Sequence, residues 1–239
     1  MITAFFWGGL AAASLLVGFY LSARRLSNRT IGMVMGFGAG ALLSAITYEL
    51  VPDSVHGGWF MVVMFLAGAL TFFGIDWMID HQGGADRKDI EGRQVGSGSA
   101  IFIGTLLDNI PESIILGMSL ALGGAINTAF MVAVFVSNLP EGVAGSLNLE
   151  SAGRSRRSIF WMWTALVIVS AACAALGYLI INWLPGADGR YAQAFAAGAM
   201  LTMLADAMMP EAFEHGGKLV GIVTVMGFLV AAILSAMEV

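Results

Sequence analysis

The sequence is short of charged residues, and this shortage excludes an ordinary water-soluble protein. Only 11% of the 239 residues are charged, whereas about a quarter of the residues in a typical soluble domain are. Apolar residues make up 58% of the chain, and the mean hydropathy is +0.84. Most of such a chain has to face lipid rather than water, so the sequence predicts a polytopic membrane protein.

Three further absences narrow the function. Cys173 is the only cysteine, so the chain can form neither an internal disulfide nor a two-cysteine metal or redox site. No basic run is long enough to follow a phosphate backbone, which excludes nucleic acid as a partner. The zinc-protease, intramembrane aspartyl-protease, nucleophile-elbow and Walker motifs are also missing. We therefore expect no enzymatic activity.

Eight apolar segments are long enough for a helix to cross the hydrocarbon core, which takes about 20 residues. They are 2–22, 31–51, 59–79, 98–122, 126–147, 160–184, 191–210 and 219–237. No basic residue precedes the first segment, and Arg24 and Arg25 follow it, so we expect it to stay in the mature chain rather than be cleaved as a signal peptide. The prediction is an all-α fold in which residues 1–239 form a single transmembrane domain.

Basic residues determine the predicted orientation, because short loops rich in Lys and Arg stay in the cytoplasm. Ten of the eleven Lys and Arg residues fall in loops on one side, including the predicted loop 80–97, and only Arg190 falls on the other. Both termini are then expected outside, in the periplasm or the extracellular space. The expected location is the cell inner (plasma) membrane.

Two internal repeats indicate how the spans are related. The stretch from Phe37 to Leu43 in the second span is similar to the stretch from Phe195 to Leu201 in the seventh, 158 residues later. Asp-Asn-Ile-Pro-Glu at 108–112 is similar to Ser-Asn-Leu-Pro-Glu at 137–141, 29 residues later. Each pair crosses in opposite directions, so we predict three helices, an inverted central pair and three more helices. Many secondary transporters have such inverted repeats around a mid-membrane site, although repeats can also be inherited scaffolding without transport.

Acidic residues inside the spans indicate a path for cations. There are six, and no Lys or Arg joins them there: Glu49, Asp76, Asp108, Glu112, Glu141 and Asp206. A carboxylate at this depth costs several kcal/mol unless it is paired or hydrated, so a cation that comes and goes is the expected partner. Glu49 is a candidate for an entrance and Asp206 for an exit. For Asp76, near the cytoplasmic end of its span, we expect the side chain to extend to the interface instead.

The fourth and fifth spans supply the main candidate metal ligands. Residues three or four apart share one side of a helix, and each of these spans carries three polar residues at that spacing. They are Asp108, Asn109 and Glu112 in the fourth span and Ser137, Asn138 and Glu141 in the fifth. Oxygen donors of this kind suit divalent cations. The alternative is that the asparagine and glutamate side chains only join the helices by hydrogen bonds.

These proline motifs, the eight spans and the inverted repeats resemble the ZIP (Zrt-, Irt-like protein) family of divalent-metal transporters, over the whole chain. That family usually has His-Asn-x-Pro-Glu-Gly in helix four and a related Pro-Glu or His-Glu motif in helix five. The resemblance implies that the six residues of the two motifs line paired metal sites. It also implies that the metal is the transported substrate, carried into the cytoplasm by alternating access, rather than a resident cofactor.

The chain departs from the family pattern in ways that bear on the choice of metal. Asp108 stands where the family has a histidine, and Ala207 stands at the usual acidic position three residues before Pro210. The site is therefore harder, so Mn²⁺, Fe²⁺ and Co²⁺ are candidates beside Zn²⁺. A transport-inactive metal receptor or scaffold, or an ion channel, is the alternative function. Divalent cations and membrane lipid are the expected partners, and the sequence leaves a homodimer open.

Overall fold

The structure is a computed structural model that describes residues 1–24, 26–51, 58–79, 81, 98–123, 127–183 and 189–238. Of residues 98–101, 123 and 238 it describes the backbone alone. Every regular element in these ranges is a helix, so the predicted all-α fold is confirmed. The predicted loop 80–97 lies outside the described residues apart from His81.

Helices are found at each of the eight apolar segments, and three of the eight rods are divided into shorter elements. In chain order the rods are α1 (Ile2–Ala12) with α2 (Ser14–Ser22); α3 (Asn28–Ala45) with η1 (Ile46–Leu50); α5 (Trp59–Ile79); α6 (Gly98–Gly123); α7 (Thr128–Ser151); α8 (Arg156–Trp183); α9 (Arg190–Met203) with η3 (Leu204–Met208) and α10 (Met209–Gly216); and α11 (Leu219–Glu238). Among the described residues, seven rods are long and apolar enough to cross a membrane. The remaining helix, α6, has 26 residues and is about 39 Å long at 1.5 Å per residue.

The helices extend beyond the predicted apolar segments at several ends. Helix α7 continues to Ser151, α8 already begins at Arg156, and α10 continues to Gly216. Hydropathy marks where the apolar surface stops, whereas the backbone hydrogen bonds continue into polar residues at the membrane surface. Pro210 does not end its helix, because it lies in the first turn of α10, where a missing N–H costs little.

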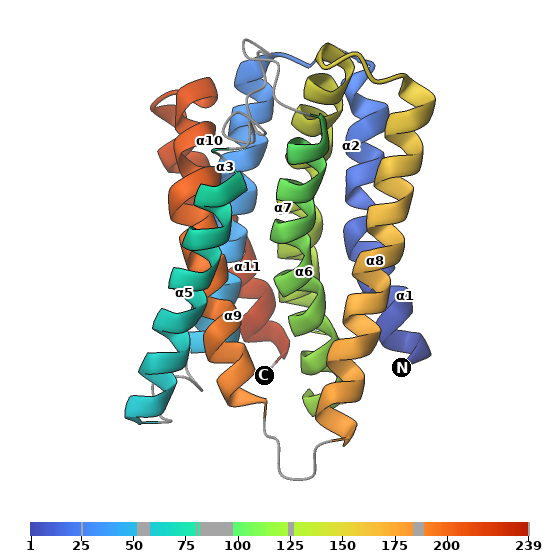
Figure 1. The fold of residues 1–239 in the computed structure, drawn as a ribbon. Helices are drawn as coiled ribbons and strands as arrows, with labels where there is room; N and C mark the ends of the chain where they lie inside the picture. Colours follow the sequence, from blue (N-terminus) through green and yellow to red (C-terminus); the bar gives the residue numbers. More distant parts are fainter. Residues whose placement is uncertain are drawn as a thin grey trace.

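Both chain termini lie at the same end of the bundle (Figure 1). The predicted topology places this end outside, and we refer to it as the outer end. Helix α7 lies between two groups of helices and packs against α2 in one group and α3 in the other. The first group contains α1, α2, α6 and α8, and the second contains α3, α5, α9, α10 and α11.

Two π-helical turns confirm the first repeat. They are η1 (Ile46–Leu50) and η3 (Leu204–Met208), and each directly follows the repeated stretch of its span. Their first residues are 158 positions apart, the same offset as in the sequence repeat. Helices α3 and α9 also run in opposite directions through the bundle (Figure 1). Because π-turns are rare and often occur at functional sites, two of them at matched positions indicate a shared structural device.

Glycines bring pairs of helices into backbone contact at crossings that obey the same repeat. In the α3–α11 pair, an added Cβ on Gly40 would lie 1.9 Å from the carbonyl oxygen of Thr224, and one on Gly227 would lie 2.0 Å from that of Phe37. The α9–α5 pair repeats this arrangement with the residues 158 or 159 positions away. There an added Cβ on Gly198 would lie 1.9 Å from the carbonyl oxygen of Phe65, and one on Gly68 would lie 1.8 Å from that of Phe195.

The same reciprocal crossing recurs in the α2–α7 and α6–α8 pairs. Gly18 and Gly142 would each place a Cβ 2.5 Å from a carbonyl oxygen of the other helix. An added Cβ on Gly117 would lie 1.8 Å from a carbonyl oxygen of α8, and one on Gly177 would lie 2.2 Å from a carbonyl oxygen of α6. Gly18 and Gly177 are 159 positions apart, so the inverted repeat extends through all three helices of each half, well beyond the stretch that is recognisable in the sequence.

We predict that Gly68→Ala destabilises the protein and that Gly74→Ala, on the same helix, does not. The first variant forces a methyl group into the backbone of α9, and overpacking of this kind costs about 1–3 kcal/mol. An added Cβ on Gly74 meets no atom within 4 Å. Thermal unfolding of the purified variants in detergent measures the difference. Equal melting temperatures for the two variants would contradict the close crossing of α5 and α9.

Candidate functional site

The six polar residues of the two proline motifs are buried in the middle of α6 and α7. Their exposed fractions lie between 1% and 4% for Asp108, Asn109, Glu112, Ser137, Asn138 and Glu141. Both helices continue without a break through Pro111 and Pro140. The protein therefore holds amide and carboxyl groups at mid-span and screens them from lipid.

A hydrogen bond between two asparagines joins the motifs. Asn138 donates from Nδ2 to Oδ1 of Asn109 over 3.1 Å, and Asn109 donates from its own Nδ2 to the carbonyl oxygen of Thr105 over 2.9 Å. Asn109 and Asn138 are equivalent residues of the repeat, 29 positions apart. The two motifs thus meet at the same residue of each copy of the sequence repeat.

A third helix closes the site next to Ser137. The Ser137 hydroxyl donates to the carbonyl oxygen of Val134 over 2.9 Å. On the opposite side lies Gly38 of α3, where an added Cβ would be 2.8 Å from the Ser137 Cα and 3.3 Å from the Met208 side chain. Any larger residue at position 38 would push α3 away from the motif of α7.

The buried carboxylates are not gathered into one compact cluster. In the described part of the chain, no three His, Cys, Asp or Glu side chains lie close enough together to hold a metal ion. One contact between the motifs is the hydrogen bond of the two asparagines. The sequence has no Lys or Arg between Arg93 and Arg154, so neither motif carries a basic residue. Burial of carboxylates is costly in such a setting, which makes this region the candidate functional site.

Glu49 is placed at the outer end of the bundle, in η1. Both of its carboxylate oxygens accept hydrogen bonds, Oε2 from Asn127 and Oε1 from the Ser235 hydroxyl. Asn127 is the N-cap of α7, and its Oδ1 accepts from the backbone N–H of Phe130 over 2.7 Å. Sequence reasoning missed Asn127 and Ser235. An asparagine directly before an apolar helix is a recognisable N-cap signal, but nothing in the sequence links it to Glu49.

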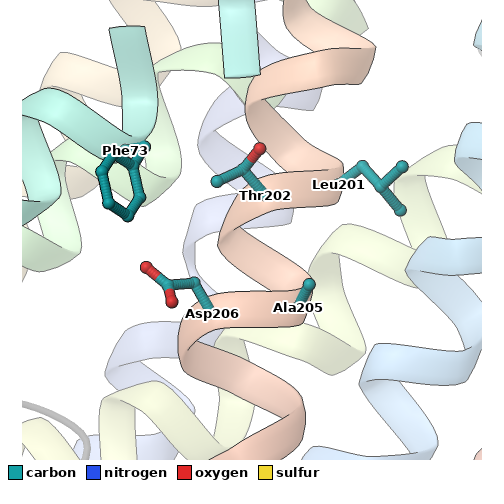
Figure 2. Close-up of a pocket in the computed structure, with 5 residues that line it drawn as sticks. All are labelled: Phe73, Leu201, Thr202, Ala205 and Asp206. Atoms are coloured by element: carbon teal, nitrogen blue, oxygen red, sulfur yellow. The ribbon is translucent and has the colours of Figure 1, made fainter. Parts of the chain in front are cut away.

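Asp206 lies in η3, on the wall of a pocket of about 310 Å³ between η3, α9 and α5. Its carboxylate and the ring of Phe73 extend toward one another, and Thr202 lies one turn away (Figure 2). The side chain is exposed in the pocket. The other acid of this region, Asp76, is only 3% exposed, so the expectation that it extends to the interface was wrong.

Comparison with known proteins finds relatives that are named as zinc transporters. The zinc transporter ZupT of Salmonella arizonae is 28% identical over 221 residues, which cover 86% of this chain and 84% of ZupT. ZupT of Salmonella newport is 27% identical over the same extent. A candidate zinc transporter of Arabidopsis thaliana is 28% identical over 200 residues, but this chain spans only 31% of that protein. No protein-family model matches the chain.

We predict that Asn109→Ala lowers the free energy of unfolding by about 1–3 kcal/mol, because it leaves the buried Nδ2 of Asn138 without its acceptor. Asn182→Ala is the matched control. Asn182 donates to the carbonyl oxygen of Tyr178, four residues earlier, as Asn109 does to that of Thr105, but Asn182 is exposed.

Chemical denaturation of Asn109→Ala, of Asn138→Ala and of the double variant Asn109→Ala/Asn138→Ala measures the coupling between the two asparagines. We expect the double variant to lose less stability than the sum of the single variants, because one shared contact is removed. Strict additivity would mean that the two asparagines do not interact.

Proposed function

We propose that this chain, a member of the ZIP family of metal transporters, carries divalent metal cations across a membrane along a polar path between α6 and α7. The ZupT relatives are named zinc transporters, and divalent-metal transport is the activity at the level of the family. The path through α6 and α7 is our own inference from the site. No enzymatic role is proposed.

The observation that carries the proposal is the Asn109–Asn138 contact between the two repeated motifs at mid-span. It brings together two helices that each hold buried carboxyl and amide oxygens. In transporters with inverted repeats, substrate sites occur near the bilayer midplane between the repeats. Asn109 Oδ1 is already an acceptor, so a metal ion bound there would replace the amide hydrogen of Asn138. Glu112 and Glu141 would supply the charge.

The ends of the path are assigned from the positions of the remaining acids. Glu49, at the outer end, is the candidate entrance, and Asp206, in the pocket beside Phe73, is the candidate exit toward the cytoplasm. Farther along the same rod, in α10, His215 Nε2 lies 2.9 Å from Glu211 Oε1. Alternating access would open the path to one side at a time, with uptake into the cytoplasm.

The first test removes the charge of the central glutamates without changing their shape. We expect Glu112→Gln or Glu141→Gln to lower metal uptake into proteoliposomes at least about tenfold, the effect of a 1.4 kcal/mol loss of interaction. Glu150→Gln is the matched control on α7. Glu150 is ten residues from Pro140 along the same helix and pairs with Arg156 at 2.6 Å. Unchanged uptake by both central variants would disprove the path.

The second test concerns the choice of metal. Asp108→His replaces a hard oxygen donor in α6 by a borderline nitrogen donor, and imidazole suits Zn²⁺ better than Mn²⁺. We expect the ratio of Zn²⁺ to Mn²⁺ uptake to rise in this variant. Competition between the two ions in the same vesicles measures the ratio directly. An unchanged ratio would mean that position 108 does not select the metal.

A further inference from the structure

The hydrogen bonds around Glu49 connect α7, which lies between the two groups of helices, to α3 and α11 of the second group, against which α7 also packs. Glu49 lies in η1, which continues α3, and Ser235 lies in α11, which crosses α3 at Gly40. These two residues therefore belong to one closely packed pair of helices. Asn127, by contrast, is the N-cap of α7, the helix that carries Ser137, Asn138 and Glu141. The Glu49–Asn127 hydrogen bond is thus a link between α7 and the α3–α11 pair.

The geometry makes this link more than a surface contact. Oε1 of Glu49 is held by the Ser235 hydroxyl, which directs Oε2 toward Nδ2 of Asn127. Oδ1 of Asn127 is used in turn to cap α7 through the backbone N–H of Phe130. The three hydrogen bonds use different atoms and can form together. A shift of the Glu49 carboxylate therefore moves Asn127 and, with it, the first turn of α7.

The inverted repeat contains no second copy of this link. The residues equivalent to Glu49 and Ser235 are Ala207, 158 positions later, and Asp76, 159 positions earlier. Alanine cannot accept a hydrogen bond through its side chain, so the contact cannot be reproduced at the other end. The aromatic packing also differs. Tyr48 packs on Phe228 with ring centroids 6.1 Å apart, whereas its equivalent, Asp206, lines a pocket.

We propose that Glu49 is a positioning residue that latches the outer end of α7 to η1 and α11, and that the Glu49–Asn127 contact has to open for metal to enter from outside. The proposal rests on the transport function above and adds a contact that regulates when metal can enter. It assigns Glu49 a role through α7, in addition to any attraction of cations. The latch is one-sided, so it regulates access from the outer end alone.

A reversible cross-link tests the latch. In a Cys173→Ala background, which has no other cysteine, Glu49→Cys and Asn127→Cys place two thiols at the contact for a short bifunctional thiosulfonate. We expect cross-linking to lower metal uptake at least about tenfold and reduction to restore it. The control pair is Tyr48→Cys with Phe228→Cys, whose rings pack between η1 and α11 with centroids 6.1 Å apart, without involving α7 or Glu49. Cross-linking this pair should leave uptake unchanged.

Two outcomes would overturn the latch: undiminished uptake with the first pair cross-linked, or an equal loss with both pairs. The second outcome would mean that the block is not specific to α7. If wild-type vesicles take up no metal at all, the proposed function fails instead, and the latch is then tested by accessibility alone.

The accessibility test measures how fast a reagent labels a buried position, and it needs no cysteine pair at the contact. It therefore applies even if the double-cysteine variants do not fold. Asn127→Asp keeps the acceptor that caps α7 but removes the donor to Glu49 and sets a second carboxylate against it. The reporter is Ser137→Cys in the Cys173→Ala background. We expect a membrane-impermeant maleimide added outside to label this cysteine several-fold faster in the Asn127→Asp variant than in the protein with Asn127. Thr128→Asp adds the same charge at the exposed next position as a control. Equal labelling rates in the two variants would overturn the latch.

Discussion

Polar groups in the middle of a membrane protein have to be kept from lipid, and the rest of this structure depends on that constraint. Six amide, hydroxyl and carboxyl side chains are buried at mid-span in α6 and α7. In lipid, helices gain little from apolar contact with one another, so close packing has to come from backbone approach. The reciprocal glycine crossings provide it. They hold α7 against α2, and α6 against α8, at the two helices that carry the motifs.

The two halves of the molecule share a backbone plan but differ in chemistry. The π-turns, and the residues of the outer helices at the crossings, recur at offsets of 158 or 159 residues. The side chains beside the π-turns do not recur: Glu49 corresponds to Ala207, Ser235 to Asp76 and Tyr48 to Asp206. A symmetric frame with asymmetric side chains gives the two ends of the bundle different chemistry. A hydrogen-bonded link stands at one end and a pocket with an exposed carboxylate at the other.

Sequence reasoning worked where the physical signal is local. Hydropathy located all eight rods, and the repeated Asn-x-Pro-Glu motif identified the two helices that meet at Asn109 and Asn138. It failed where the signal is a contact between distant segments. The Glu49–Asn127 hydrogen bond joins residues 78 positions apart, and neither residue type predicts the other. The crossings at Gly18 and Gly177 were also missed, because the repeat survives there only as glycine spacing.

The matched π-turns bear on the history of the chain. A π-turn arises when one residue is inserted into an α-helix, and η1 and η3 carry that extra residue at the same place in each half. Two independent insertions at one position are far less economical than a single insertion that was copied. The simplest order of events is therefore an ancestral three-helix unit that already contained the turn, followed by duplication in the opposite orientation. In that order of events, the acids beside the turns diverged after the duplication.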